Sequence, residues 1–232
     1  TSGLIACDNS NSCRGATHIR IPDNRVTIQE NAFRMNKNLV SVHIPDSVTR
    51  IRQNAFRDCS NLRSVTIGNG VTSIDEYAFS GCASLRDVVI GNSVIRIRDN
   101  AFWGCSRLPS IVIPDSVESI GNRVFQYCKN LALVKIPDNV TRIGSGAFYQ
   151  CIRLAEVEIG NGITRIMNGT FRECTSLNNV TIPDSVTSIG KRAFYGCRSL
   201  KSIIIPNNVS IGNNAFENCG CSPNLYRPGN VI

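Results

Sequence analysis

The chain has 232 residues, 42% of them hydrophobic, and its 25 Lys and Arg against 17 Asp and Glu give a formal net charge of +8 at pH 7. This length suffices for one large domain or two small ones. Because no run of about 18 apolar residues occurs, we expect no membrane-spanning helix, and no cleavable signal peptide is visible at Thr1. Without a basic run or a basic-aromatic motif, the positive charge does not predict a nucleic-acid partner.

The N-terminal segment, residues 1–16, lacks the pattern that organises the rest of the chain, and it holds two cysteines. Cys7 and Cys13 flank a short polar loop, which a disulfide between them could close. Such a disulfide would place the protein outside the cytoplasm, whereas the alternative is two free thiols on a cytosolic chain. Residues 4–7, Leu-Ile-Ala-Cys, also resemble a bacterial lipoprotein processing box, which would make Cys7 a lipid anchor.

From residue 17 onward the sequence repeats itself, and the phenylalanines mark the period. Their spacing is constant up to Phe194, and every phenylalanine of the chain belongs to the series: Phe33, Phe56, Phe79, Phe102, Phe125, Phe148, Phe171, Phe194 and Phe216. Only the last interval is shorter, because residues 209–211 are one residue shorter than the equivalent stretch at 186–189. A period of about 23 residues is typical of repeat proteins and indicates a solenoid of stacked units.

One unit, taken from residue 39, begins with two extended pieces joined by a turn. Val42 and Ile44 are two residues apart and therefore share one face of a short strand. The turn at residues 45–47 reads Pro-Asp-Ser, and all three are frequent turn formers. Val48 and Ile51 then point inward from a second short extended piece.

The rest of the unit has the spacing of one helical face. Ala55, Phe56, Cys59 and Leu62 fall at i, i+1, i+4 and i+7, which predicts a short helical turn. No single unit can bury its apolar side alone, so the units are expected to stack on one another.

The repeated unit resembles a known family. Its pattern, L-x-x-V-x-I-P-D-S-V-T-x-I-G-x-x-A-F-x-x-C, has its clearest copy at residues 177–199 and resembles the BspA-like, treponemal-type leucine-rich repeat of surface proteins. The resemblance covers about residues 17–219 and departs from the pattern only mildly, at Arg25, Asn36 and Val124.

The resemblance implies an α/β solenoid, an arc of about nine 23-residue coils. Parallel strands would line its concave face, and short helical or 3-10 turns its convex face. Residues 1–16 would form an N-terminal cap and residues 220–232 a C-terminal cap or tail, because end coils need polar covers.

Eight of the eleven cysteines occupy one position of the repeat: Cys59, Cys82, Cys105, Cys128, Cys151, Cys174, Cys197 and Cys219. A metal site needs ligands that converge, whereas these thiols would run in a line, one per coil. We therefore expect small buried thiols that pack as weakly hydrogen-bonding hydrophobes, with no metal and no cofactor. Cys221 could pair with Cys219 or with another chain.

The residues that could support catalysis are few and open to solvent. His18, His43 and Ser41 lie on adjacent predicted strands, but Asp87, the acid that a triad would require, is two strands away. Glu156 and Glu158 share one strand face, yet that face is an open surface with nothing to exclude water, and Lys135 lies directly beside Glu158. The sequence therefore does not predict an enzyme.

In a solenoid the residues that recur form the scaffold, and the residues that vary between units determine what its surface can bind. Two surfaces are candidates here. On the concave face, Val89, Val112 and Leu133 are apolar where water is expected, and Asp87, Lys135, Glu156 and Glu158 surround them. An exposed apolar strip with a charged rim is typical of a protein-binding patch; the alternative is that β-branched residues simply suit strands.

The second surface is the convex rim, where the candidate anchors are aromatic: Trp103, Tyr127, Tyr149 and Tyr195. Such rings are favoured in interfaces, but they could equally shield the coil below. A basic column is predicted from four arginines at one repeat position: Arg50, Arg96, Arg142 and Arg165. Their mutual repulsion would be relieved by acidic neighbours or by an anionic partner, such as a sialylated or sulfated glycan.

The resemblance implies a non-enzymatic adhesion or recognition module, located outside the cell or on its surface, that binds a protein, matrix or glycan partner. The alternative is a structural subunit that stacks end to end into a fibre, since an exposed sheet edge is a template for pairing. Sequons for N-glycosylation, relevant only in a eukaryotic secretory route, begin at Asn139, Asn168, Asn179 and Asn208.

Overall fold

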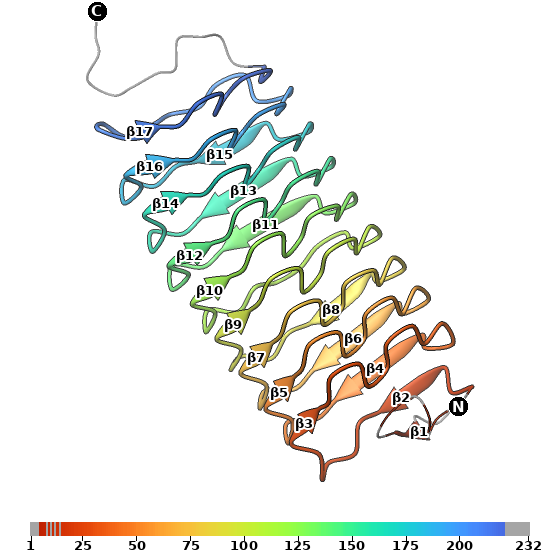
Figure 1. Ribbon diagram of the computed structural model, residues 1–232. Helices are drawn as coiled ribbons and strands as arrows, with labels where there is room; N and C mark the ends of the chain where they lie inside the picture. The colour runs from red at the N-terminus through yellow and green to blue at the C-terminus, as the bar shows by residue number, and fades with distance from the viewer. Residues whose placement is uncertain (1–4, 8, 10, 12, 14, 221–232) are drawn as a thin grey trace, which may run out of the picture.

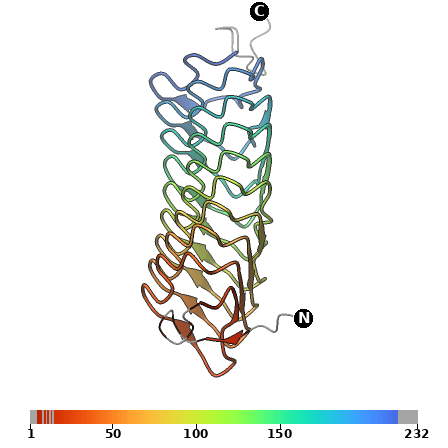
Figure 2. The same cartoon turned by 90° about the vertical axis from the view of Figure 1, so that its right-hand side faces the viewer.

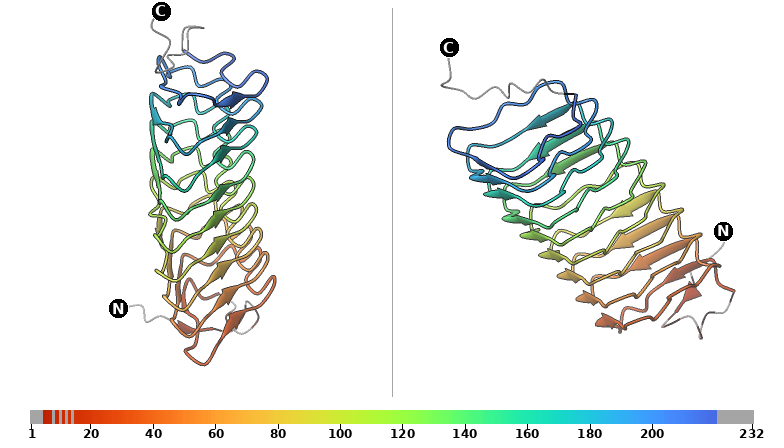
Figure 3. Two further views of the ribbon diagram at one scale, coloured as in Figure 1. Left: turned by 90° about the vertical axis from the view of Figure 1, so that its left-hand side faces the viewer. Right: turned by 45° about the horizontal axis from the view of Figure 1, so that its top comes forward.

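The chain winds into a single stack of coils with two rows of parallel strands (Figures 1 and 3). The structure is a computed structural model that describes residues 5–7, 9, 11, 13 and 15–220. Seen from the side, the coils lie one above another along the whole stack (Figure 2). The predicted solenoid is therefore confirmed.

The first sheet is made by the first extended piece of each unit and contains the longer strands. In order along the stack they are β1 (Ile5–Ala6), β2 (His18–Arg20), β4 (Ser41–Ile44), β6 (Ser64–Ile67), β8 (Asp87–Val89), β11 (Leu133–Ile136), β13 (Glu156–Ile159) and β15 (Asn179–Thr181). Pairing is broken between β8 and β11, so the sheet falls into two segments. These strands are the ones expected on the concave face.

The second sheet is made by the second extended piece, two residues per coil. Its strands are β3 (Thr27–Ile28), β5 (Arg50–Ile51), β7 (Ser73–Ile74), β9 (Arg96–Ile97), β10 (Ser119–Ile120), β12 (Arg142–Ile143), β14 (Arg165–Ile166), β16 (Ser188–Ile189) and β17 (Ser210–Ile211). Successive strands pair with equivalent residues in register, as Ile51 does with Ile74, except that β12 and β14 are not paired. Equivalent residues of neighbouring coils therefore lie side by side.

The core between the sheets consists of the residues that recur. Val42, Ile44 and Ile51 are buried, and so is every phenylalanine from Phe33 to Phe194. The nine rings form one continuous pile, with centroids of neighbouring rings 5.1 to 5.7 Å apart and nearly parallel planes. Stacking one ring on the next in each coil removes a large apolar area from water.

The predicted helical turns on the convex side are wrong, because no helix occurs in the described part of the chain. Each coil instead carries two residues in the left-handed region, such as Asn54 (φ 56°) and Asp58 (φ 60°), which no α-helix tolerates. The Phe56 N–H donates to the Ala78 carbonyl of the next coil at 2.7 Å rather than to its own turn. The segment is therefore a run of turns that hydrogen-bonds along the stack.

The cysteine ladder is buried and linear. Each thiol from Cys59 to Cys197 donates to the carbonyl of the phenylalanine 26 residues earlier, as Cys59 does to Phe33 at 3.0 Å. These seven cysteines are free and buried, whereas Cys219 is disulfide-bonded and so departs from the expected row of thiols. Cys221 lies outside the described residues.

Burial makes these thiols chemically inert, which can be measured. Burial raises the pKa of Cys105 and Cys128 well above its usual value, and that of Cys197 to about 12, because the thiolate would lose its hydration. We expect the seven ladder thiols to stay unreactive towards Ellman's reagent at pH 8 in the folded protein. All seven should react after unfolding in guanidinium chloride. Rapid reaction of the folded protein would contradict the buried ladder.

At the N-terminal end, β1 adds a strand to the first sheet beside β2, with Ile5 paired to Ile19. Cys7 and Cys13 form a disulfide with their Cα atoms 5.8 Å apart, and both side chains are buried against the first coil. Of the C-terminal cap expected at residues 220–232, only Gly220 is described.

Candidate binding surfaces

The outward positions of the first sheet carry an apolar strip. Val89, Val112 and Leu133 come from three successive coils and are 59%, 79% and 52% exposed. Their neighbours along the strands, such as Val134, point into the core, because alternate residues of a strand face opposite sides. We name these three residues the apolar strip.

The apolar strip lies where the first sheet is interrupted. Pro109 occupies the repeat position of Arg86, whose N–H donates to the Arg63 carbonyl in the neighbouring coil. Proline has no N–H, so it cannot form the equivalent hydrogen bond. The coil of Val112 therefore pairs only through an isolated bridge between Ser110 and Leu133. Figure 1 shows this coil without an arrow between β8 and β11. The most exposed apolar side chain among the described residues thus lies on a coil with reduced strand pairing.

Charged side chains lie beside the apolar strip, as expected. Lys135 Nζ is 3.1 Å from Glu158 Oε1 in the next coil, and the hydrogen bond and charge of Glu158 raise the pKa of Lys135. Glu156 Oε1 accepts a hydrogen bond from Asn179 Nδ2 at 3.1 Å. Asp87 is exposed on β8, at the other end of the strip. Both glutamates therefore take part in surface contacts between coils.

The histidines do not assemble a catalytic group among the described residues. His18 Nδ1 lies 2.7 Å from Ser41 Oγ, so the structure does bring these two together. Asp87, however, is on β8, and β6 separates that strand from β4, which carries Ser41 and His43. Without a carboxylate against the imidazole, the pair lacks the third member of a triad.

The aromatic residues of the rim contact one another instead of standing alone. The ring centroids of Trp103 and Tyr127 are 5.4 Å apart, edge to face, and those of Tyr127 and Tyr149 are 5.7 Å apart. The Arg172 guanidinium lies 5.1 Å from the Tyr149 ring and 5.3 Å from the Tyr195 ring. The four rings therefore form one row with Arg172, a cation-π arrangement that stabilises neighbouring coils. A role in binding stays a prediction.

The predicted column of arginines lies on the outward face of the second sheet. Arg50 donates from Nε to Asp75 Oδ2 at 2.7 Å, and this contact raises the pKa of Arg50. Asp75 also accepts from Ser73 Oγ at 2.8 Å and lies 3.4 Å from Arg98. Sequence reasoning missed Asp75, although an Asp at a repeat position that is often glycine was a signal for it. At Arg50 the charge repulsion predicted for the arginine column is therefore relieved by an acidic neighbour.

The four sequons lie on exposed asparagines. Asn139 Nδ2 donates to the Asp115 carbonyl, and Asn168 Oδ1 accepts from the Lys191 N–H of the next coil at 2.9 Å. With the bond from Asn179 to Glu156, three of the four side chains join neighbouring coils. Glycosylation at these positions stays a prediction.

Neither a metal-binding cluster nor a membrane-crossing helix is found in the part of the chain that the structure describes. No group of three or more His, Cys, Asp or Glu side chains is placed to hold a metal ion there. Within the same residues, no helix has the length and apolar character needed to cross a bilayer.

Comparison with known proteins identifies the repeat. The family described as the BspA type leucine-rich repeat region matches residues 8–109 and 95–222 in six copies. No curated protein matches the chain. A leucine-rich repeat protein from Bacteroides ovatus has a similar structure, with 30% identity, a TM-score of 0.67, and coverage of 88% of this chain but only 61% of that one.

Two further bacterial structures are similar. A leucine-rich cell surface protein from Faecalibacterium prausnitzii shares 26% identity with a TM-score of 0.52, over 92% of this chain and 88% of that one. A leucine-rich repeat protein from T. pallidum shares 27% identity with a TM-score of 0.58, over 89% and 78%. Since the family match spans nearly the whole repeat region, the chain belongs to the BspA-type leucine-rich repeat family.

Proposed function

We propose that the protein is a recognition or adhesion scaffold that acts outside the cytoplasm and binds a protein partner through the apolar strip on its first sheet. The observation that carries this proposal is the exposure of Val89, Val112 and Leu133 on successive coils. Val112 shares the repeat position of Val89, and Leu133 is opposite Ser110 on the next coil. Neighbouring exposed apolar side chains of this kind mark interaction sites on soluble proteins. The family supplies the scaffold, and the strip is a feature of this chain.

The rim of the apolar strip suits a protein partner. Protein interfaces combine an apolar centre with a charged or polar edge that excludes water and fixes orientation. Here Asp87 lies at one end, and the Lys135–Glu158 ion pair lies at the other. A depression of about 520 Å³ beside that pair has a polar lining that includes Asp115 and Asp138. A partner that inserts apolar groups over Val112 and basic groups beside Asp115 would fit this surface.

Two observations support a location outside the cytoplasm. The disulfide between Cys7 and Cys13 is a bond that persists in oxidising compartments. The F. prausnitzii relative, which covers most of this chain, is described as a cell surface protein.

The experiment is a binding screen against extracellular matrix proteins, followed by affinity measurements on two variants. Changing Val89, Val112 and Leu133 together to Asp should weaken binding of the protein identified in the screen by at least about 100-fold, because truncating or charging central anchors costs several kcal/mol. The matched control is Ile204→Asp, which changes a 62% exposed apolar residue several coils away, at the repeat position that Val89 and Val112 occupy. Unaltered binding by the triple variant would remove the strip as the site.

End-to-end assembly is the second candidate, and one observation favours it. In the described part of the chain, β3 pairs only with β5, and Val26 and Met35 on the same coil are exposed. An open strand edge beside apolar side chains is a template for another sheet. Light scattering over a concentration series separates the two candidates, because only a stacking subunit grows with concentration.

A further inference from the structure

Three arginines on the second sheet hold charge that the fold does not neutralise. Arg96, Arg142 and Arg165 occupy the repeat position of Arg50, but none of them forms an ion pair with a residue that the structure describes. Arg142 and Arg165 lie on β12 and β14, which are neighbouring strands in contact along the stack. Like charges on neighbouring strands repel. Asp75 neutralises Arg50 and Arg98 instead, as described above.

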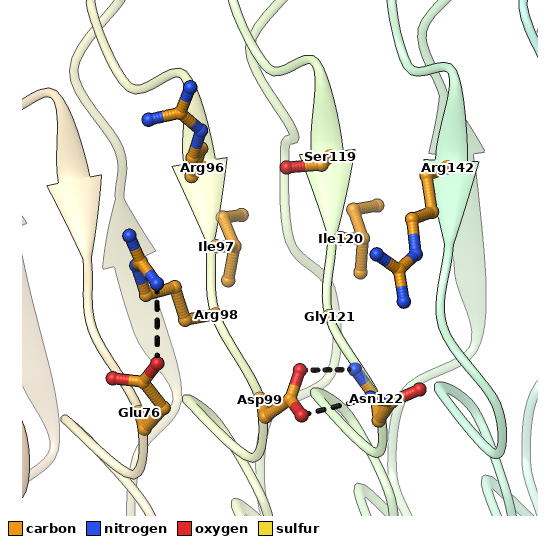
Figure 4. A pocket seen from close by; sticks show the side chains of 10 residues that line it. All are labelled: Glu76, Arg96, Ile97, Arg98, Asp99, Ser119, Ile120, Gly121, Asn122 and Arg142. Carbon is orange, nitrogen blue, oxygen red and sulfur yellow. Dashed lines mark hydrogen bonds and ion pairs between the residues drawn. The ribbon is translucent and has the colours of Figure 1, made fainter.

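A polar depression of about 440 Å³ lies between Arg96 and Arg142 (Figure 4). Ser119 pairs in register with Arg96 on one side and with Arg142 on the other. The floor is Gly121, where the coil before lies so close that an added Cβ would come within 2.6 Å of the Asp99 nitrogen. In the coil before, the same repeat position carries Arg98, whose side chain also lines the depression.

The lining offers donors for an anion and partners for hydroxyl groups. Figure 4 shows the Arg142 side chain turned towards Ile120 and Gly121, with the Ser119 hydroxyl directed towards the strand of Arg96. At the lower edge, Asp99 is already engaged, since it accepts from the Asn122 backbone N–H at 2.8 Å and from Asn122 Nδ2 at 2.9 Å. Glu76, the other carboxylate of the lining, lies 3.4 Å from Arg98 Nη1. Among the described residues neither carboxylate forms an ion pair with Arg96 or Arg142, which leaves their guanidinium groups open to an added anion.

We infer that the second sheet binds a sulfated glycan, with its sulfate groups on Arg96, Arg142 and Arg165 and its sugar hydroxyls over the depression at Gly121. A chain laid across the strands would meet the three guanidinium groups in that order. Guanidinium groups bind tetrahedral oxyanions through paired hydrogen bonds. This site is on a different sheet from the apolar strip and does not depend on it.

The composition of this face favours a glycan over other polyanions. The outward residues of its strands are Thr, Arg and Ser, in the order Thr27, Arg50, Ser73, Arg96, Ser119, Arg142, Arg165, Ser188 and Ser210. Single-stranded nucleic acids are held largely by aromatic rings that stack on bases, and no ring is in this series. Hydroxyl and guanidinium groups are instead suited to sugar hydroxyls and sulfates.

The test replaces the arginines by the residue that the fold already uses at their position. The site variant changes Arg96, Arg142 and Arg165 to Ser, which is native at this position in four other coils. The control variant changes Arg107, Arg153 and Arg198 to Ser, which removes the same charge from exposed turn positions. Serine is also native at those positions, as Ser84 and Ser106 show, and thermal unfolding verifies that both variants fold.

Affinity for dextran sulfate, for neutral dextran and for single-stranded DNA is measured by calorimetry at about 0.15 M salt, where long-range attraction is screened. We expect wild type to bind dextran sulfate but not dextran, and the site variant to bind at least about tenfold more weakly. The control variant should change by less than about twofold.

Three results would overturn the inference: no binding of dextran sulfate, an equal loss in both variants, or equally strong arginine-dependent binding of DNA. The triple Asp variant of the apolar strip should bind dextran sulfate like wild type. Loss of the protein partner and loss of the glycan are therefore separate outcomes.

Discussion

Replacing Phe102 by Ala is expected to lower the free energy of unfolding by about 3–5 kcal/mol, the usual cost of removing a fully buried aromatic ring. The ring is completely buried and stacks on Phe79 at 5.3 Å and on Phe125 at 5.7 Å. Its removal leaves a cavity in the middle of the pile that the neighbouring coils cannot close, because their backbones are tied by hydrogen bonds every repeat. In a solenoid a defect in a central coil also weakens both of its interfaces.

The same substitution at the end of the pile is the control. Phe216 is only partly buried, and its ring has one stacked neighbour, Phe194 at 5.3 Å. Phe216→Ala should therefore cost about half as much or less, since both the apolar area and the cavity are smaller. Urea unfolding followed by circular dichroism gives both values. Equal destabilisation at the two positions would contradict a pile in which each ring is held by its neighbours.

The arrangement of the coils could be predicted because the repeat carries the information many times. Val42, Ile44 and Ile51 alternate with polar residues, and the same alternation recurs in each repeat, so the inward face is defined without reference to distant parts of the chain. Both sheets, the phenylalanine pile and the thiol ladder from Cys59 to Cys197 follow from it. If a strand were shifted by one residue, all of its inward apolar side chains would face solvent.

The backbone of the convex side could not be predicted from side-chain spacing alone. Ala55, Phe56, Cys59 and Leu62 have the spacing of a helix, but the same inward side chains also fit a run of turns. The decisive signal was the recurrence of asparagine and glycine at the two left-handed positions, at 31, 54, 100 and 146 and at 81, 104 and 196. Glycine and asparagine adopt this conformation at least cost, so their repetition argues against a helix.

The candidate surfaces were predictable only in part. Alternation along the strand is enough to place Val89, Val112 and Lys135 outward, and the ion pair between Lys135 and Glu158 follows from their positions in adjacent coils. The Asp at position 75, where other coils often carry glycine, was a signal for an acidic neighbour, but its contact with Arg50 depends on how side chains two residues apart in the repeat reach across the coils. The depression between Arg96 and Arg142 was likewise not predictable, because it depends on how the side chains of several coils pack around it.

The strongest test of the alternation compares one chemical change at two positions in neighbouring coils. Val134→Asp is expected to cost more than about 5 kcal/mol, which is comparable to the stability of a whole domain. Val134 is fully buried on β11, so the variant loses the burial of an isopropyl group, and its carboxyl group has no hydrogen-bonding partner in the core. Val112→Asp, at a side chain that is 79% exposed, should stay within about 0.5 kcal/mol of wild type.

The dependence on pH gives the comparison a second readout. Burial would raise the pKa of the carboxyl introduced at position 134 above its value in the unfolded chain, because the core favours the neutral form. The variant is least destabilised at a pH below the pKa of this carboxyl group in the unfolded chain. Its stability falls as the pH rises from that value towards the pKa of the same group in the folded protein. Val134→Asp should therefore be less destabilised relative to wild type at pH 4 than at pH 7, whereas Val112→Asp should show little difference. Chemical unfolding at the two pH values measures both effects. If the two variants were equally stable, then the side chains of the first sheet would not alternate between core and solvent, and the apolar strip would lose its physical basis.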